Sequence, residues 1–350
     1  MNTIKVNAST AYEVQIGCGL LYQLGQAVKA VTKVGIASIV SDSNVFPRYG
    51  EIAKKSLENA GFSVVSFVFT AGEESKNGST YLSLLNFLAS HQLTRSDCLI
   101  ALGGGVVGDL TGFAAATYLR GISYIQVPTS LLAMVDSSVG GKTAIDLDCG
   151  KNLAGAFYQP KLVLCDTDIL NTLPEDVFRD GCAEVIKYGI LYDANLFAHL
   201  LDKGLFFDRN SVISRCVELK RDVVAVDEFD TGSRMKLNLG HTIGHGIELC
   251  SHYCISHGKA VAAGMAIVAR AGAKLGICAS HVAQAVTQIL ETFSLPVGTE
   301  YSAQQLFDAA LSDKKRAGDL VQLITVEDIG SCAIRPTQVN ELKAFIEAGL

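Results

Sequence analysis

The first half of the chain alternates short apolar, β-branched runs with segments of helical periodicity. Near-continuous apolar runs are typical of strands buried on both faces of a parallel sheet. The predicted strands are Ile36–Ser41, Ser63–Phe69, Cys98–Leu102, Ser123–Val127 and Leu162–Cys165. The predicted helices are Tyr49–Ala60, Ser79–His91 and Asp109–Thr117. This alternation predicts a Rossmann-like, mostly parallel sheet with helices packed on it.

The pattern changes after the last of these strands. From Pro174 onward helical periodicity dominates, and only Leu320–Thr325 has clear strand character. We therefore predict an α/β N-terminal domain at residues 1–168 followed by an α-helical C-terminal domain at residues 169–350. The active site is expected in the cleft between the two domains, because ligand sites are common at domain interfaces.

Composition narrows the class of protein. The 350 residues are 49% hydrophobic, which excludes a disordered chain, and the net charge of −6 does not indicate a nucleic acid or a membrane surface as partner. The ten cysteines are scattered, several within apolar runs, which favours reduced thiols and a cytoplasmic location. The segment Met1–Val6 alternates like a first strand and does not read as a secretory leader.

A glycine-rich turn follows the predicted strand Cys98–Leu102. Gly103, Gly105 and Gly108 satisfy the pattern G-x-G-x-x-G between a strand and a helix, where backbone N–H groups and a helix N-terminus can hold a pyrophosphate. The acidic residue expected about 20 positions later is missing, and Asp42 is a substitute candidate for a ribose hydroxyl. A glycine-rich packing turn is the alternative.

Two lysines and an amide gather further along the chain in turn-rich sequence. Gly141-Lys142-Thr143 suggests a P-loop, but the required glycine five residues before Gly141 is Asp136, so that interpretation fails. Lys142, Lys151 and Asn152 remain candidates for binding phosphate or carboxylate oxygens. A solvated surface loop is the alternative.

A polar stripe lies in the C-terminal half. Arg234, Asn238, His241 and His245 are spaced as one face of a helix whose intervening residues are apolar. Buried polar side chains need partners, so either a structural network or a ligand site is expected.

Two more residues extend this candidate site. Glu184 lies on another helical segment with Lys187 one turn later, and His257 lies at an apparent helix start. One carboxylate and two histidines can hold a divalent metal, although their spacing alone does not establish a site. A competing zinc site made of His257 with Cys250, His252 and Cys254 is disfavoured, because the spacing is too short.

Together, these motifs resemble those of the 3-dehydroquinate synthase family, and the resemblance covers most of the chain. The matching segments, in order, are Gly72–Lys76, Gly103–Asp109, Val127–Thr143, Gly150–Asn152, Ala183–Gly189, Leu237–His245 and Asp313–Lys315. The resemblance implies a phosphorus–oxygen lyase of the shikimate pathway that converts 3-deoxy-D-arabino-heptulosonate 7-phosphate to 3-dehydroquinate and phosphate. It implies that NAD is oxidised and re-reduced within each turnover, that a Zn²⁺ or Co²⁺ ion takes part, and that an aldol step closes the ring.

The resemblance also assigns residues. The implied metal ligands are Glu184, His241 and His257. The implied catalytic residues are Lys142, Lys187, Arg234, Asn238 and His245, with His245 as a candidate proton shuttle. The implied substrate-binding residues are Arg120, Asp136, Asn152, Lys220 and Lys314. The implied NAD-binding residues are Asp42, Glu73, Lys76, Gly105, Val106, Val107, Gly108, Asp109, Thr129, Ser130, Lys142, Lys151 and Thr172. The implied partner is an anionic sugar phosphate, and a homodimer is left open.

Two other functions stay open. A metal-dependent NAD polyol dehydrogenase resembles this family in fold but has no need of the basic residues. Another sugar-phosphate cyclase is expected to change the residues that contact the substrate carboxylate. One departure from the family pattern is Lys259, which stands where a glutamate is usual after His257-Gly258. We expect its side chain to face away from the metal, and Lys259→Glu to stabilise the fold modestly, because a cation is unfavourable at a helix N-terminus.

Overall fold

The computed structural model describes residues 1–313 and 320–350, and these divide into two compact units. The first unit contains residues 1–174 and 209–229, and the second contains residues 175–208 and 230–350. Residues 209–229, which the predicted boundary at 168 assigns to the C-terminal domain, therefore pack with the N-terminal unit. The predicted Lys314 lies outside the described residues.

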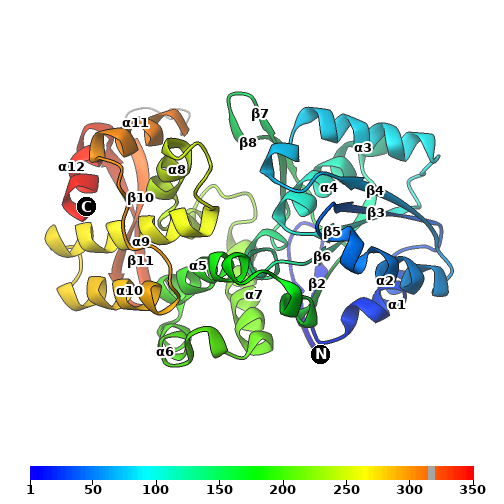
Figure 1. The fold of residues 1–350 in the computed structure, drawn as a ribbon, viewed down its shortest axis with the longest axis horizontal. Coiled ribbons are helices and arrows are strands. Elements are labelled where there is room, and N and C mark those ends of the chain that lie inside the picture. The colour runs from blue at the N-terminus through cyan, green and yellow to red at the C-terminus, as the bar shows by residue number, and fades with distance from the viewer. Residues whose placement is uncertain (314–319) are drawn as a thin grey trace. The chain divides into compact units, whose positions relative to one another are not determined.

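The first unit is built on a seven-stranded sheet (Figure 1). Its strands, in the order in which they neighbour one another, are β1 (Asn2–Val6), β2 (Tyr12–Gly17), β9 (Leu162–Asp166), β6 (Ser123–Pro128), β5 (Cys98–Gly103), β3 (Ile36–Asp42) and β4 (Ser63–Phe69). Only the β1–β2 pair is antiparallel, and every other pair is parallel. The prediction of a mostly parallel sheet is confirmed, with the five predicted strands in place.

Five helices and a β-hairpin complete this unit. The helices are α1 (Leu24–Val31), α2 (Phe46–Asn59), α3 (Gly78–Ser90), α4 (Gly105–Thr117) and α7 (Arg209–Val226). The hairpin consists of β7 (Lys142–Leu147) and β8 (Gly150–Phe157), where the sequence suggested only turns. The core includes Leu84 and Leu88 of α3, Leu99 of β5 and Leu110 of α4, all fully buried. Burial of this apolar surface fixes α4 against the sheet.

The strand order reverses direction between β3 and β5. The chain passes from β3 outward to β4 and then returns to β5 on the other side of β3. At such a switch point the carboxyl ends of two neighbouring strands leave a crevice in which ligands bind. Asp42 ends β3 and Gly103 ends β5, so the two sequence candidates for nucleotide binding lie at this switch point.

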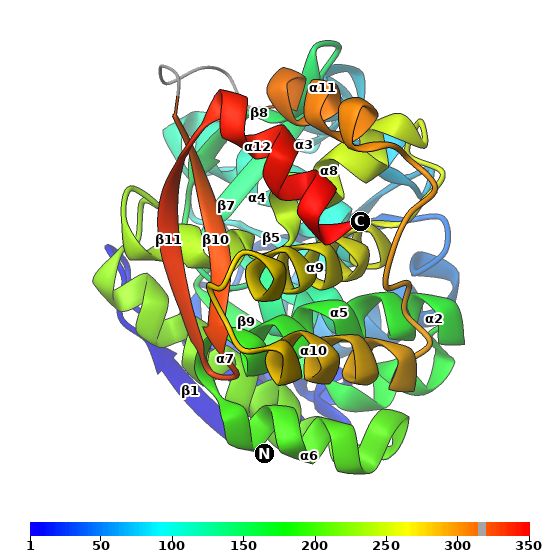
Figure 2. The same ribbon diagram turned by 90° about the vertical axis from the view of Figure 1, so that its left-hand side faces the viewer.

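The second unit is mainly helical, as predicted, and its described residues include one β-hairpin (Figure 2). Its helices are α5 (Glu175–Tyr192), α6 (Ala194–Lys203), α8 (His241–Cys250), α9 (His257–Lys274), α10 (Ser280–Thr292), α11 (Ala303–Asp313) and α12 (Val339–Gly349). The hairpin pairs β10 (Leu320–Asp328) with β11 (Ser331–Gln338), and β10 packs against α9. Most residues of α9 are buried, many of them glycine or alanine, so this helix forms the centre of the unit.

Among the described residues, each helix is too short or too polar to cross a membrane. None of the ten cysteines, all of which lie within the described residues, forms a disulfide.

Candidate active site

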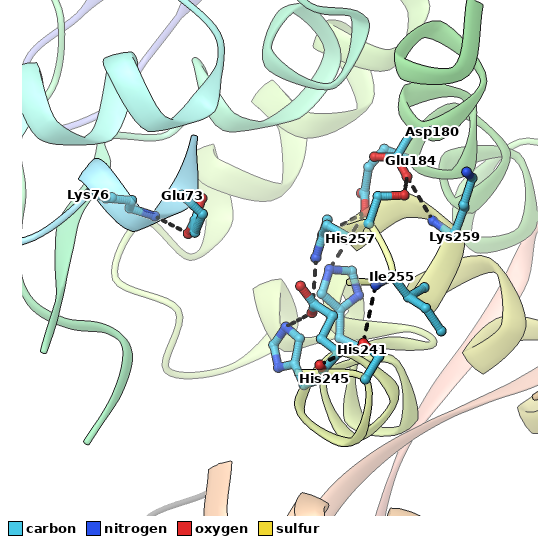
Figure 3. A network of polar contacts seen from close by, with 12 residues as sticks. Glu73, Lys76, Asp180, Glu184, His241, His245, Ile255, His257 and Lys259 are labelled. Atoms are coloured by element: carbon cyan, nitrogen blue, oxygen red, sulfur yellow. Dashed lines mark hydrogen bonds and ion pairs between the residues drawn. The ribbon is translucent and has the colours of Figure 1, made fainter. Parts of the chain in front are cut away.

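Three side chains of the second unit meet where α5, α8 and α9 come together (Figure 3). Glu184 lies in the middle of α5, whereas His241 and His257 are the first residues of α8 and α9. The Nε2 atoms of His241 and His257 each lie 3.6 Å from Oε1 of Glu184. One ligand atom from each residue lies within 4.8 Å of the others, so the three implied metal ligands form one cluster.

Glycines allow α8 and α9 to approach closely enough for this meeting. Gly240 has a φ of +78° immediately before α8, and a Cβ there would lie 2.7 Å from the carbonyl oxygen of Val261. A Cβ on Gly264 would lie 2.1 Å from the carbonyl oxygen of Gly240. Both contacts are shorter than real Cβ atoms accept, so only glycine fits at these positions.

Gly240 also explains why the prediction of one continuous helix from Arg234 to His245 is wrong. The sequence spacing predicts a single helix face carrying Arg234, Asn238, His241 and His245. Instead a 3-10 helix, Ser233–Asn238, ends before Gly240, and α8 begins at His241. The left-handed backbone at Gly240 breaks the helix. Arg234, only 2% exposed, and Asn238 are therefore held on a separate turn from the two histidines.

Both histidines implied as metal ligands have a hydrogen-bond acceptor at the ring nitrogen opposite Glu184. Nδ1 of His241 lies 3.0 Å from the carbonyl oxygen of Leu239, and Nδ1 of His257 lies 3.4 Å from Oε2 of Glu248. Each ring thus has a hydrogen-bond acceptor at Nδ1 while its Nε2 faces Glu184. Metal-ligating histidines usually have such an acceptor behind them.

The pKa values of His241 and His257 shift in opposite directions. Burial and the nearby Lys187 ammonium lower the pKa of His241 to about 3. Burial also opposes a charge on His257, but its hydrogen bonds to Glu184 and Glu248 outweigh burial and raise the pKa of His257 to about 10. The pocket between Glu184 and Glu248 therefore favours a positive charge.

Two further implied residues lie beside the cluster. Lys187 is one turn after Glu184 on α5, is 1% exposed, and forms an ion pair with Oε2 of Glu184. His245 lies one turn after His241 on α8, and their ring centroids are 5.5 Å apart. The side chain of His245 is 38% exposed, so it combines contact with the cluster with access to solvent.

Glu248 is the residue of this cluster that the sequence interpretation missed. It is buried, and its Oε2 also lies 4.0 Å from Nε2 of His245. A signal existed, because Glu248 is three residues after His245, on the same face of α8. A second possible ligand group, His245, Glu248 and His257, shares His257 with the first.

Lys259 faces away from this cluster, as expected (Figure 3). Its side chain lines a small cavity of about 190 Å³ together with Ile247, Ala263 and Glu300. Its backbone N–H donates to Oδ1 of Asp180 on α5, at 2.9 Å. Asp180 also accepts from the hydroxyl of Ser256, so a carboxylate already lies at the N-terminus of α9.

In the first unit, several implied NAD-binding residues surround the switch point. Gly105 begins α4, and the N–H of Thr129 donates to the carbonyl oxygen of Gly103 at 3.0 Å. Oδ1 of Asp42 accepts from the N–H groups of Asn44 and Val45, which fixes the Asp42 side chain at the end of β3. The helix N-terminus and the strand ends thus offer a frame for an anion.

A buried polar network lies nearby in the same unit. The Lys76 ammonium lies 2.8 Å from Oδ2 of Asp109, 2.5 Å from Oδ1 of Asn152 and 3.5 Å from Oε1 of Glu73. Burial opposes the charge on Lys76, but the carboxylates of Asp109 and Glu73 raise its pKa above the ordinary value. The network joins Asn152, implied in substrate binding, to three residues implied in NAD binding.

The remaining candidates of the first unit are more dispersed. Lys220 on α7 is buried and contacts Oδ1 of Asp136 at 2.9 Å. The hydroxyl of Thr172 forms a hydrogen bond with that of Tyr49. The other implied residues lie on α4, after β6, on the β7–β8 hairpin or after α4, namely Val106, Val107, Gly108, Ser130, Lys142, Lys151 and Arg120. Their roles stay predictions.

A parallel sheet with a glycine turn at its switch point, together with a carboxylate–histidine cluster on helices, is typical of enzymes that combine a nucleotide with a divalent metal. The comparisons specify the family. The 3-dehydroquinate synthase N-terminal model matches residues 66–180, and the 3-dehydroquinate synthase C-terminal model matches residues 181–316. The chain belongs to the 3-dehydroquinate synthase family.

Curated relatives agree over nearly the full length. The chain is 41% identical to the 3-dehydroquinate synthase of Clostridium acetobutylicum over 353 residues, covering 99% of each chain. It is 42% identical to that of Streptococcus pneumoniae over 342 residues, covering 96% of each. Among solved structures it is similar to a 2-deoxy-scyllo-inosose synthase complexed with carbaglucose-6-phosphate, NAD⁺ and Co²⁺, with a TM-score of 0.89, 26% identity and 100% of both chains covered.

Proposed function

We propose that this chain catalyses the conversion of 3-deoxy-D-arabino-heptulosonate 7-phosphate to 3-dehydroquinate and phosphate, in the cytoplasm, and that it depends on NAD and a divalent metal. Family membership supports the overall reaction. The observation that carries the proposed metal dependence is the convergence of two histidine Nε2 atoms on Oε1 of Glu184.

The donor set fits the proposed metal. One carboxylate and two imidazoles are ligands that Zn²⁺ and Co²⁺ accept, and three protein ligands leave coordination positions for substrate oxygens. When bound, the metal would polarise a substrate hydroxyl and NAD⁺ would accept and later return a hydride. The chain's part is to hold Glu184, His241 and His257 in place, which it does through glycine-mediated helix contacts and the acceptors behind both rings.

The NAD site is proposed at the switch point of the sheet. The N-terminus of α4 at Gly105 would face the pyrophosphate, because helix N-termini favour anions. Asp42, at the end of the neighbouring strand, would accept from a ribose hydroxyl. The Lys76–Asp109 pair lies on the same unit and would border the nucleotide.

The substrate carries a carboxylate and a phosphate, and the chain offers buried cations that match them. Lys220 and Lys187 are held in defined positions by Asp136 and Glu184. Fixed cations bind anions without losing rotamer freedom at that moment. His245 is part-exposed and lies next to the two proposed ligand histidines, and it would move a proton through its imidazole.

The test is turnover with defined components. Purified protein is incubated with the heptulosonate phosphate, a catalytic amount of NAD⁺ and Zn²⁺ or Co²⁺, while inorganic phosphate and the ring product are measured. We expect many turnovers for each NAD⁺, with no build-up of absorbance at 340 nm. Stoichiometric NADH would instead indicate a polyol dehydrogenase, and a ring product other than 3-dehydroquinate would indicate a different cyclase.

A further inference from the structure

Glu248 contacts His257, one of the proposed metal ligands, at the ring nitrogen opposite Glu184. It is a buried residue of α8, and its Oε2 lies 3.4 Å from Nδ1 of His257. The opposite nitrogen, Nε2, lies 3.6 Å from Oε1 of Glu184. The imidazole of His257 is therefore held between two carboxylates, one at each nitrogen.

Only one tautomer of this ring suits a metal that lies beside Glu184. A neutral imidazole has one N–H donor and one lone pair, and the metal takes the lone pair. Glu248 is a hydrogen-bond acceptor at Nδ1, so it favours the proton there and leaves the lone pair at Nε2, on the side of Glu184. The carbonyl oxygen of Leu239 does the same for His241, at 3.0 Å from its Nδ1.

The backbone of Glu248 also shapes the turn that leads to His257. Its carbonyl oxygen accepts from the N–H of Tyr253 at 2.7 Å and from the hydroxyl of Ser251 at 2.9 Å. The Ser251 hydroxyl in turn accepts from the N–H of Ile255 at 3.2 Å. One residue thus organises the connection between α8 and α9 and contacts the first side chain of α9.

We propose that Glu248 is a positioning residue, which orients His257 with Nδ1 protonated and Nε2 directed at Glu184. The proposal rests on the metal site of the proposed function. It concerns a residue that is not among the three proposed ligands. Groups that orient a ligand histidine in this way commonly change metal affinity by about 10–100-fold when they are replaced.

The test compares three substitutions of Glu248 by Zn²⁺ binding, measured calorimetrically with the full chain. Glu248→Ala should weaken Zn²⁺ binding by about 10–100-fold. Glu248→Gln keeps an acceptor oxygen at the same reach and should recover most of the affinity. Glu248→Asp keeps the charge but withdraws the carboxylate by one methylene, so it should bind more weakly than Gln. Glu291→Gln, an exposed substitution on α10, is the matched control and should leave binding unchanged.

A second measurement shows which ring nitrogen of His257 carries the proton. Long-range ¹H–¹⁵N spectra of histidine-labelled protein distinguish the two tautomers, with His257→Gln used to assign the signal. We expect Zn²⁺-bound wild-type protein and Glu248→Gln to show the proton on Nδ1. If Glu248→Ala does not fold, as judged by circular dichroism, the proposal is tested by whether Glu248→Gln binds Zn²⁺ more tightly than Glu248→Asp.

The proposal is wrong if Glu248→Asp binds Zn²⁺ as tightly as Glu248→Gln. It is also wrong if Glu248→Ala has wild-type Zn²⁺ affinity and an unchanged spectrum. Failure of the wild-type protein itself to bind Zn²⁺ would overturn the metal site of the proposed function along with it. The two failures are therefore distinguishable.

Discussion

The Lys76 ammonium lies 2.8 Å from Oδ2 of Asp109, and the two side chains are 5% and 20% exposed. Glu73 approaches the same ammonium, so one cation holds two carboxylates together. Removing it leaves both carboxylates in a partly dry environment with no counter-charge. The pair is therefore a point where the stability of the first unit is sensitive to a single change.

We expect Lys76→Met to destabilise the protein strongly. Breaking a buried pair costs about 3–5 kcal/mol, and the partial exposure of Asp109 places this case at the lower end. The free energy of unfolding is measured in urea without NAD, for Lys76→Met, Asp109→Asn and the double variant. The double variant should be more stable than the sum of the single effects predicts. Additive single effects would show that the pair is not coupled.

Metal binding should release a proton. Because the pKa of His257 is raised to about 10, its imidazole is protonated at neutral pH in protein without metal, and the ion must displace that proton. His241, with its pKa lowered to about 3, releases none. Calorimetry of Zn²⁺ binding near pH 7 in two buffers of different ionisation enthalpy should give about one proton per ion. Equal heats in the two buffers would contradict this assignment.

The same two histidines give metal-depleted protein opposite pH dependences. The raised pKa of His257 contributes stability that is fully present below pH 6.5 and is lost as the pH rises through about 10. The lowered pKa of His241 contributes stability present above pH 6.5 and lost as the pH falls toward about 3. Urea unfolding across this range should show both losses, and His257→Gln should remove the alkaline one selectively.

Replacement of His245 should act on the chemical step. If His245 moves a proton, His245→Ala should lower kcat by about 10²–10⁴-fold, because general acid–base groups act in the transition state. Lys151→Ala, at a residue implied in NAD binding, should mainly raise the KM for NAD or substrate. Steady-state kinetics on both variants separates these outcomes. An unchanged kcat for His245→Ala would remove this residue from the reaction.

The structure changes the expected effect of Lys259→Glu. A cation at a helix N-terminus costs about 0.3–1 kcal/mol, which predicts stabilisation by the substitution. Asp180, however, already accepts from the N–H of Lys259, so a second carboxylate there would be repelled. We therefore expect Lys259→Glu to change the free energy of unfolding by no more than about 0.5 kcal/mol and to leave metal affinity unaltered.

Asp180→Ala is the companion substitution at this helix start. It removes the acceptor for Ser256 and Lys259 and should cost about 0.5–2 kcal/mol, as the loss of a cap does. Thermal unfolding of both variants tests the pair. A large gain for Lys259→Glu would show that Asp180 does not compensate the helix end.

The sequence predicts five strands of the sheet well, because each is a near-continuous apolar run, but it misses β2, whose residues alternate between polar and apolar. Ser63–Phe69 matches β4 at both ends. The strand β11 escapes prediction, because Arg335 and Pro336 interrupt its pattern and its pairing with β10 is a tertiary effect. The break before α8 escapes as well: the apolar spacing continues through Gly240, and only the contact with α9 reveals its left-handed backbone.

The proposed metal-ligand cluster is also only partly predictable from the sequence. The identity of Glu184, His241 and His257 follows from resemblance to the family, but their approach depends on helix contacts that spacing does not encode. The helical spacing puts Glu248 on the same face of α8 as His245, but only the structure shows its contact with Nδ1 of His257.

Helix α7 has a consequence for synthesis of the chain. It contributes Lys220 to the first unit and packs on β1 and β2, yet residues 175–208 of the second unit precede it. A nascent chain emerges N-terminus first, at about 5–20 residues per second. The first unit is therefore completed only after residue 229 has left the ribosome, with α5 and α6 already outside and still waiting for α8, α9 and α10. A protein cut near residue 168 would lack α7 and leave the antiparallel edge of its sheet uncovered on that side.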